Sequence, residues 1–234
     1  MFQTDPFALI VVLVGLSLIP FVAMIATSYL KIVVVMSLIR NALGIQSIPP
    51  NMVVNALAMI LTFYIMAPVA SESWGAIVES QKTMVATQGK PASQSANAHE
   101  PSTFNLSSLD LGTAAEPFRK FLSDHTAPRE RAFFVKTAET LWGKDGELAV
   151  VDPESFWILL PSFCVSELTK AFQIGFLVYL PFIAIDIIVS NILLAMGMMM
   201  VSPVTISLPF KLLLFVMVNG WTLLVQGLVK GYII

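Results

Sequence analysis

The sequence predicts an all-α, membrane-associated protein, and three observations lead to this fold class. Hydrophobic residues make up 56% of the 234 residues and charged residues only 12%, whereas soluble domains contain about 25% charged residues. Two uncharged runs, residues 6–30 and 41–71, exceed the roughly 20 helical residues that cross a hydrocarbon core. The polar middle of the chain carries signals that begin and end helices. We therefore expect kinked helical hairpins joined by a mostly helical polar insert.

The N-terminal part, residues 1–71, is expected to form an apolar helical hairpin. Its two uncharged runs are separated only by Lys31, an apolar stretch and Arg40. The residues before the first run include Asp5 but no Lys or Arg, and no clear cleavage site follows, so we expect this segment to be retained rather than removed as a signal peptide. We expect Lys31 and Arg40 to lie in a short loop between the two runs, and their positive charges favour the cytoplasmic side for this loop. The polar segment that follows the second run then lies on the periplasmic side.

Residues 72–154 form a polar insert that holds most of the charged residues of the chain. Its residues 80–108 are rich in Ser, Ala, Gln and Asn, a composition typical of flexible chain. A proline at the first position and a glycine after the last predict a helix over residues 128–142. The Asp-Pro-Glu sequence at residues 152–154 predicts the start of another helix, because Asp caps helix N-termini.

The C-terminal part, residues 155–234, is apolar again but is interrupted by charges and prolines. Proline inside an apolar helix frees backbone groups, so broken helices at membrane depth are usually buried in protein or line a cavity. We therefore expect broken helices rather than plain membrane anchors, with helix breaks at Pro181, Pro203 and Pro209. The charged residues of this part are Glu167, Lys170, Asp186, Lys211 and Lys230.

A weak internal repeat favours a design of two related halves. LSLIPFVAM at residues 16–24 resembles LVYLPFIAI at residues 177–185, and Pro20 aligns with Pro181. A second proline follows each of these two at nearly the same distance. Similar apolar segments also arise by chance, so the repeat leaves both duplication and coincidence open.

No set of residues predicts catalysis or metal binding. His99 and His125 lie in the polar insert without metal-ligand spacing, and the sequence lacks nucleotide-binding and hydrolase motifs. The lone Cys164 excludes an intramolecular disulfide and a cysteine metal cluster. The net charge of −2 gives no basic bias towards nucleic acid. The sequence therefore predicts a protein that is not an enzyme and that has no cofactor, no metal and no nucleic-acid partner.

Asp186 and Lys211 predict a buried charge pair. A charge at bilayer depth costs roughly 2.5 to 3.5 kcal/mol on insertion scales and normally finds a partner or water. The two residues carry opposite signs, and the prolines between them allow the chain to fold back, within one subunit or between subunits. A proton or ion relay is the alternative, although a relay usually needs more titratable groups.

The sequence MGMMM, residues 196–200, predicts a deformable seal. The candidate gasket residues are Met198, Met199 and Met200, next to Met196 and Gly197. Methionine is flexible and fills irregular gaps, but three consecutive residues cannot all face one side of a helix, which advances about 100° per residue. A loop at this point lets several methionines converge. In a ring of copies they form an apolar collar that excludes water and ions yet yields to a passing chain; ordinary core or lipid-facing packing is the alternative.

Three C-terminal motifs, FIAIDIIVSN, MGMMM and ISLPFKLLLFVMVNGW, follow one another in this order. They resemble the signature of the FliP/SctR family, the core export-gate proteins of flagellar and virulence type III secretion systems. The block PFVAMIATSYLKIVVVMSLIRNALGIQSIPPNMVVNALAMILT is similar to the N-terminal half of the same family. The resemblance covers the two apolar thirds of the chain, whereas the polar insert carries no recognisable motif.

The resemblance implies an all-helical protein that assembles as a homopentamer, with SctS/FliQ-like and SctT/FliR-like partners, into a helical pore complex. This complex lies in the bacterial inner membrane and protrudes towards the periplasm, and unfolded secreted proteins pass through its centre. A switch protein of the SctU/FlhB type and inner rod or needle components are further implied partners. By the same resemblance, Met198, Met199 and Met200 form the gasket of the resting pore. Asp186 and Lys211 fall at charged positions of the family.

The start of the sequence favours one branch of this family. Flagellar members generally begin with a cleavable signal sequence, whereas this sequence begins almost directly with its first apolar segment. This favours the virulence injectisome branch over a flagellar export gate. Two other hypotheses stay open: a self-contained secondary carrier, which the possible repeat and the buried charges favour, and a purely structural membrane scaffold.

Overall fold

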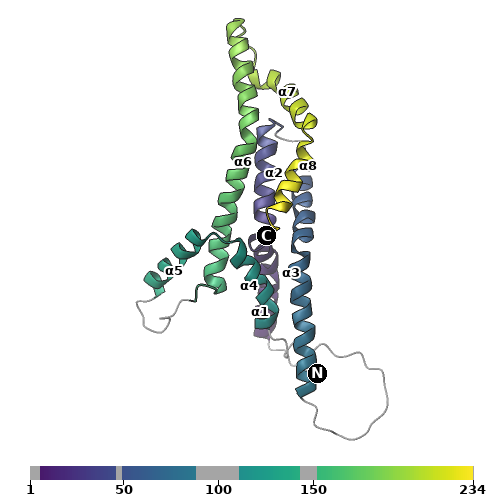
Figure 1. Cartoon of the computed structure of the whole chain (residues 1–234), viewed down its shortest axis with the longest axis vertical. Coiled ribbons are helices and arrows are strands. Elements are labelled where there is room, and N and C mark those ends of the chain that lie inside the picture. Colours follow the sequence, from purple (N-terminus) through teal and green to yellow (C-terminus); the bar gives the residue numbers. More distant parts are fainter. Residues whose placement is uncertain (1–5, 46–48, 88–110, 143–151, 234) are drawn as a thin grey trace, which may run out of the picture.

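The structure, a computed structural model, describes residues 6–45, 49–87, 111–142 and 152–233. Throughout these residues the regular secondary structure is α-helical, which confirms the all-α fold class. The molecule is elongated: α3 (Asn51–Thr87) and α6 (Phe156–Ala195) run along its long axis, and α5 (Pro128–Trp142) projects sideways (Figure 1). The other helices are α1 (Pro6–Ile25), α2 (Tyr29–Ala42), α4 (Leu111–His125), α7 (Pro203–Met217) and α8 (Gly220–Lys230).

The first uncharged run is divided between two helices. The helix axis bends by 58° between α1 and α2. At this bend the Thr27 hydroxyl donates to the Ala23 carbonyl at 2.6 Å and accepts the Tyr29 backbone N–H at 3.4 Å. A hydroxyl that bonds nearby backbone groups competes with the regular helical pattern, which accounts for the break.

Lys31 and Arg40 lie inside α2, and the prediction that they occupy a loop was therefore wrong. Lys31 is only 2% exposed, and Arg40 bonds the Pro49 carbonyl at 3.4 Å and the Asn51 side chain at the start of α3. Buried and paired charges do not count as loop charges in the positive-inside rule. The membrane orientation inferred from them accordingly loses its basis.

The polar insert begins inside a helix and contains two more. α3 continues past the expected boundary at residue 71 as far as Thr87, so the N-terminal part of the flexible stretch is helical. Residues 88–108 of that stretch lie outside the described residues. α5 has the bounds that its proline and glycine predict. α6, however, begins at Phe156 rather than at Asp152, because Asp152 instead accepts the Glu154 N–H at 2.9 Å in a turn that precedes the helix.

The predicted helix breaks at Pro181 and Pro209 were wrong. α6 continues through Pro161 and Pro181 over 40 residues, and α7 continues through Pro209. A proline removes one backbone hydrogen bond and costs about 3 kcal/mol, which burial of helix residues on both sides of it can offset. Pro203 is the first residue of α7. The backbone N–H of a residue at this position has no partner within a helix, so proline, which lacks an N–H, loses no hydrogen bond there. The chain turns instead at residues 196–202 and 218–219.

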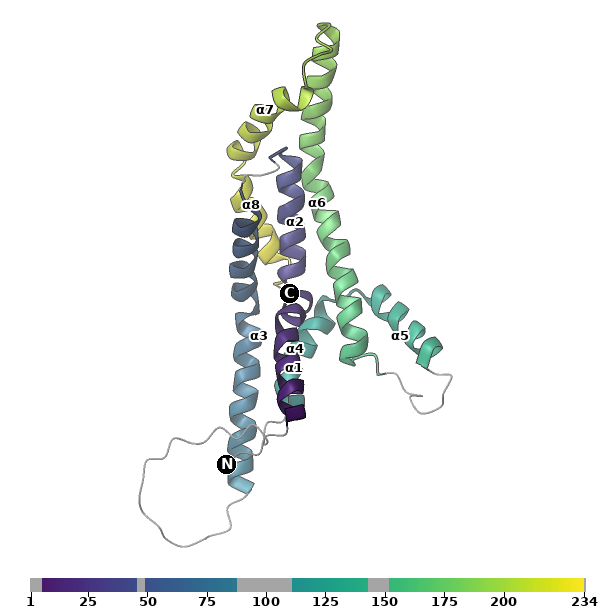
Figure 2. The same cartoon turned by 180° about the vertical axis from the view of Figure 1, so that it is seen from behind.

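The core is built around α2, which lies between α3 and α6 in both views (Figures 1 and 2). The side chains of Ile32, Val35, Met36 and Ile39 on α2 are at most 1% exposed. They pack with buried residues of α3, α6, α7 and α8. A second core joins α4 to the start of α6 through Phe121, Leu122, Leu159 and Phe163. The upper part of α6 extends beyond both cores.

The contact between α2 and α6 depends on Gly175, and we expect Gly175→Ala to destabilise the protein by about 1–3 kcal/mol. A Cβ atom at this position would lie 2.3 Å from Leu38 Cδ1 and 3.2 Å from Leu38 Cβ. Unfolding of the purified chain, followed by circular dichroism, measures the effect. Gly227→Ala on α8 is the matched control, because no atom lies within 4 Å of that Cβ position. It is expected to stabilise by about 0.5–1 kcal/mol; equal effects of the two variants would contradict the packing argument.

Candidate functional site

The methionine loop, residues 196–200, follows directly from the way α6 ends. Gly197 has the left-handed φ of 74°, which glycine adopts without a steric penalty. The Met198 N–H donates to Leu193 and the Gly197 N–H to Leu194, both at 3.0 Å. These two bonds form a Schellman motif, which satisfies the last carbonyls of the helix and fixes the direction in which the chain leaves it.

The methionine side chains are exposed at the far end of α6 from the polar insert (Figure 1). Met199 is 82% exposed and Met200 fully exposed, while Met198 is 46% exposed. Isolated exposed apolar residues are common, but a cluster of them usually marks a contact site. Within one chain, therefore, the loop presents its methionines to the surroundings and not to the core.

Asp186 of α6, ten residues before the methionine loop, forms an ion pair with Lys211 of α7. Asp186 Oδ2 lies 2.7 Å from Lys211 Nζ, and the side chains are 32% and 4% exposed. The Ser207 hydroxyl donates to Asp186 Oδ1 at 2.6 Å, and Lys211 Nζ donates to the Ala42 carbonyl at 3.2 Å. The carbonyl belongs to the last turn of α2, where the helix dipole favours a cation. The pair thus ties α7 to both α6 and α2.

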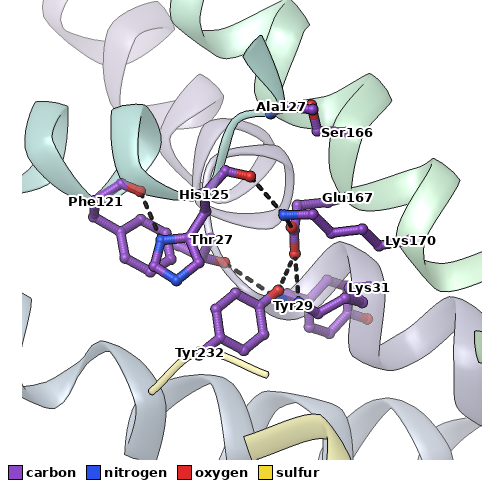
Figure 3. Close-up of polar contacts among 10 residues, drawn as sticks. All are labelled: Thr27, Tyr29, Lys31, Phe121, His125, Ala127, Ser166, Glu167, Lys170 and Tyr232. Atoms are coloured by element: carbon purple, nitrogen blue, oxygen red, sulfur yellow. Dashed lines mark hydrogen bonds and ion pairs between the residues drawn. The ribbon is translucent and has the colours of Figure 1, made fainter. Parts of the chain in front are cut away.

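A second group of charges, the central cluster, consists of Lys31, Glu167, Lys170 and Tyr232 (Figure 3). Glu167 Oε2 lies 3.1 Å from Lys31 Nζ, and Oε1 lies 3.0 Å from Lys170 Nζ. The Tyr232 hydroxyl donates to the Glu167 carboxylate. Lys31 Nζ lies 3.5 Å from the centre of the Tyr232 ring, a cation–π contact. Three segments of the chain therefore meet at one carboxylate.

The Lys31–Glu167 pair of the central cluster is deeply buried. The Glu167 side chain is fully buried and that of Lys31 is 3% exposed. Buried charges persist only when they are paired and hydrogen-bonded, and each oxygen of this carboxylate has a partner. Burial and the neighbouring Glu167 carboxylate raise the pKa of Tyr232 well above its usual value, so its hydroxyl stays protonated and remains a donor.

The central cluster also reaches the polar insert. Lys170 Nζ donates to the His125 carbonyl at the end of α4, at 2.7 Å. The His125 ring lies 5.1 Å from the Tyr232 ring, and its Nδ1 bonds the Phe121 carbonyl at 2.9 Å. The sequence shows each charged residue of the cluster but does not show which of them form ion pairs. The available signal was the presence of Lys31 and Glu167 in otherwise apolar runs, where each requires a partner.

Comparison with known proteins shows which family the chain belongs to. The FliP family matches residues 12–228, nearly the whole chain. The chain belongs to the FliP family. This confirms the resemblance to FliP/SctR proteins, which are components of the type III secretion export apparatus.

Relatives of this FliP-family chain are named as secretion and virulence proteins. The Yop proteins translocation protein R of Yersinia pestis is 50% identical over 230 residues, which cover 97% of each chain. The hypersensitivity response secretion protein HrcR of Ralstonia nicotianae is 44% identical over 227 residues, 96% of each chain. The virulence protein YscR of Salmonella typhimurium is 43% identical over 228 residues, 97% of each chain.

The helices of this FliP-family chain fit a membrane location. Among the described residues, α3 and α6 are long and apolar enough to cross a membrane, and there are up to four such spans if each bent helix pair counts as one. The same residues contain no group of three or more His, Cys, Asp or Glu that could hold a metal ion. His99 lies outside the described residues, and the Cys164 thiol is half-buried and contacts the Ile25 carbonyl at 3.5 Å.

Proposed function

We propose that this chain is the core pore-forming subunit of a type III secretion export gate. It conducts unfolded effector and needle proteins across the bacterial inner membrane, in a complex that protrudes towards the periplasm. Met198, Met199 and Met200 act as the gasket of the resting pore. The observation that carries this proposal is the exposed methionine loop, with Met199 and Met200 at least 82% exposed, on the Schellman-capped end of a 40-residue helix.

The apolar surface around the methionine loop supports assembly of several copies. The upper parts of α6 and α7 line an apolar groove that includes Ile188, Ile192 and Phe210. Each of these three side chains is more than half exposed. Surfaces of this kind normally contact lipid or another protein. We propose a homopentamer that also binds SctS/FliQ-like and SctT/FliR-like proteins, with an SctU/FlhB-like switch protein and rod or needle components as further partners.

The names of the relatives favour an injectisome over a flagellum. Secretion and virulence proteins match this chain over nearly their full length. The flagellar branch is thus the second choice. Nothing in the ion-pair geometry favours the secondary carrier, because Asp186 and Lys211 are engaged with each other, a serine and a helix carbonyl.

The native mass of the detergent-solubilised particle tests the proposal. The chain is expressed alone and together with its SctS-like and SctT-like partners, and each particle is weighed by native mass spectrometry. We expect several copies of the chain in one particle, whose mass grows in discrete steps as the partners are added. A strictly monomeric particle that the partners leave unchanged would contradict an export gate.

A further inference from the structure

Tyr232, two positions beyond the end of α8, lies where three parts of the chain meet. Its hydroxyl donates to Glu167 of α6, and its ring lies under the ammonium group of Lys31 from α2. On α4, His125 and Phe121 approach the same ring, with centroids at 5.1 and 6.1 Å. One side chain thus contacts α2, α4 and α6 at the same time.

The α7–α8 segment buries few side chains, of which Phe215 and Leu228 pack into the core around α2. α7 buries only Ser207, Lys211 and Phe215, and α8 buries only Leu228. In addition to these apolar contacts, polar contacts hold the segment at two ends: Lys211 meets Asp186 at the upper end, and Tyr232 meets Glu167 at the lower end. The two carboxylates are about 28 Å apart along α6, at about 1.5 Å per residue.

The turn between α7 and α8 has the geometry of a pivot. The two helices are bent by 59° relative to each other. Asn219, between the two helices, has a left-handed φ of 51°. A short turn of this kind can absorb a change in backbone angles while the helices on both sides stay intact.

We propose that Tyr232 is a latch that holds α8 against α2, α4 and α6. When the latch is released, α8 turns about residues 219–220, while the Asp186–Lys211 pair keeps α7 in place. Because His125 and Phe121 belong to the polar insert, the latch connects the insert to the helices that follow the methionine loop. The inference concerns the single chain and does not depend on the proposed pore.

Hydrogen–deuterium exchange of the full-length chain in lipid nanodiscs tests the latch. In Tyr232→Ala we expect backbone exchange of residues 220–230 to rise at least about tenfold, with exchange in α2 and α6 unchanged. Tyr232→Phe keeps the ring next to Lys31 and loses only the hydrogen bond to Glu167. Exchange of residues 220–230 should therefore rise less than in Tyr232→Ala. Tyr64→Ala, which removes a 71% exposed tyrosine on α3, is the matched control and should change nothing in α8.

Two results would overturn the latch. One is unchanged exchange of residues 220–230 in Tyr232→Ala. The other is an equal rise in α2, α6 and α8, which would make Tyr232 an ordinary stabilising residue of the whole fold. If the alanine variant does not fold, Tyr232→Phe decides by the same comparison, and a rise confined to α8 supports the latch. None of these results depends on the number of copies in the particle or on ion passage.

Discussion

Replacing Glu167 with alanine is expected to destabilise the protein by about 3–5 kcal/mol. Lys31, 3% exposed, loses its carboxylate partner at 3.1 Å and becomes an uncompensated buried charge. The Tyr232 hydroxyl loses its acceptor in the same step. Lys170 is affected less, because its side chain is 39% exposed and keeps the His125 carbonyl. Detergent-induced unfolding of the purified chain, followed by circular dichroism, gives the difference in free energy.

Two further variants separate the buried charge from general damage. The double variant Glu167→Ala, Lys31→Met removes both charges and keeps an unbranched apolar side chain on α2, so it should recover most of the lost stability. Glu116→Ala breaks an exposed ion pair with Arg119 at 3.4 Å and should change stability by no more than about 0.5 kcal/mol. If Glu167→Ala were as mild as Glu116→Ala, the central cluster would not stabilise the fold.

Replacing Met198, Met199 and Met200 together by alanine is expected to make the resting export gate leak ions several-fold while assembly stays intact. In the single chain Met199 and Met200 are largely exposed and Met198 is 46% exposed, so their loss should change its stability by about 0.5 kcal/mol or less. In a ring of copies, however, alanine lacks the long, flexible side chains that close the centre of the ring. Dissipation of the membrane potential in cells that express the complete gate measures the leak.

A matched triple variant controls for the loss of exposed methionines in general. Met52, Met59 and Met217 are 82%, 46% and 74% exposed, which is close to the exposure of the three loop residues. Their replacement by alanine should leave the gate closed, because they lie on α3 and α7 rather than in the loop. An equal leak in both variants would mean that methionine content, and not the methionine loop, matters.

Local signals predicted the elements whose causes are local. The bounds of α5 follow from a proline at its start and a glycine after its end, because these residues act within one turn. The methionine loop follows from Gly197, whose left-handed φ lets α6 end there. The predicted breaks at Pro181 and Pro209 failed, since a single missing hydrogen bond does not end a helix that is packed on both sides.

Long-range pairing could not be predicted from sequence patterns. The rule that a charge at membrane depth needs a partner applies to Lys31, Glu167 and Asp186 alike, but it does not name the partner. Asp186 and Lys211 can be paired from the sequence because they are near each other in it and opposite in sign. Lys31 and Glu167 lie on opposite sides of the polar insert, and only the packing of α2 against α6 brings them together. Tyr232 carries no signal in the sequence, because a single tyrosine has neither a charge that requires a partner nor a motif around it.

Ion conductance of the purified gate in a planar lipid bilayer tests the central claim, that the methionine loop seals the resting pore. The gate is assembled from this chain and its partners, and its native mass is checked before each recording. We expect the unmodified gate and the Met52, Met59, Met217 triple variant to remain closed, and the Met198, Met199, Met200 triple variant to conduct. A fully assembled Met198→Ala, Met199→Ala, Met200→Ala gate that is as ion-tight as the unmodified one would contradict the claim.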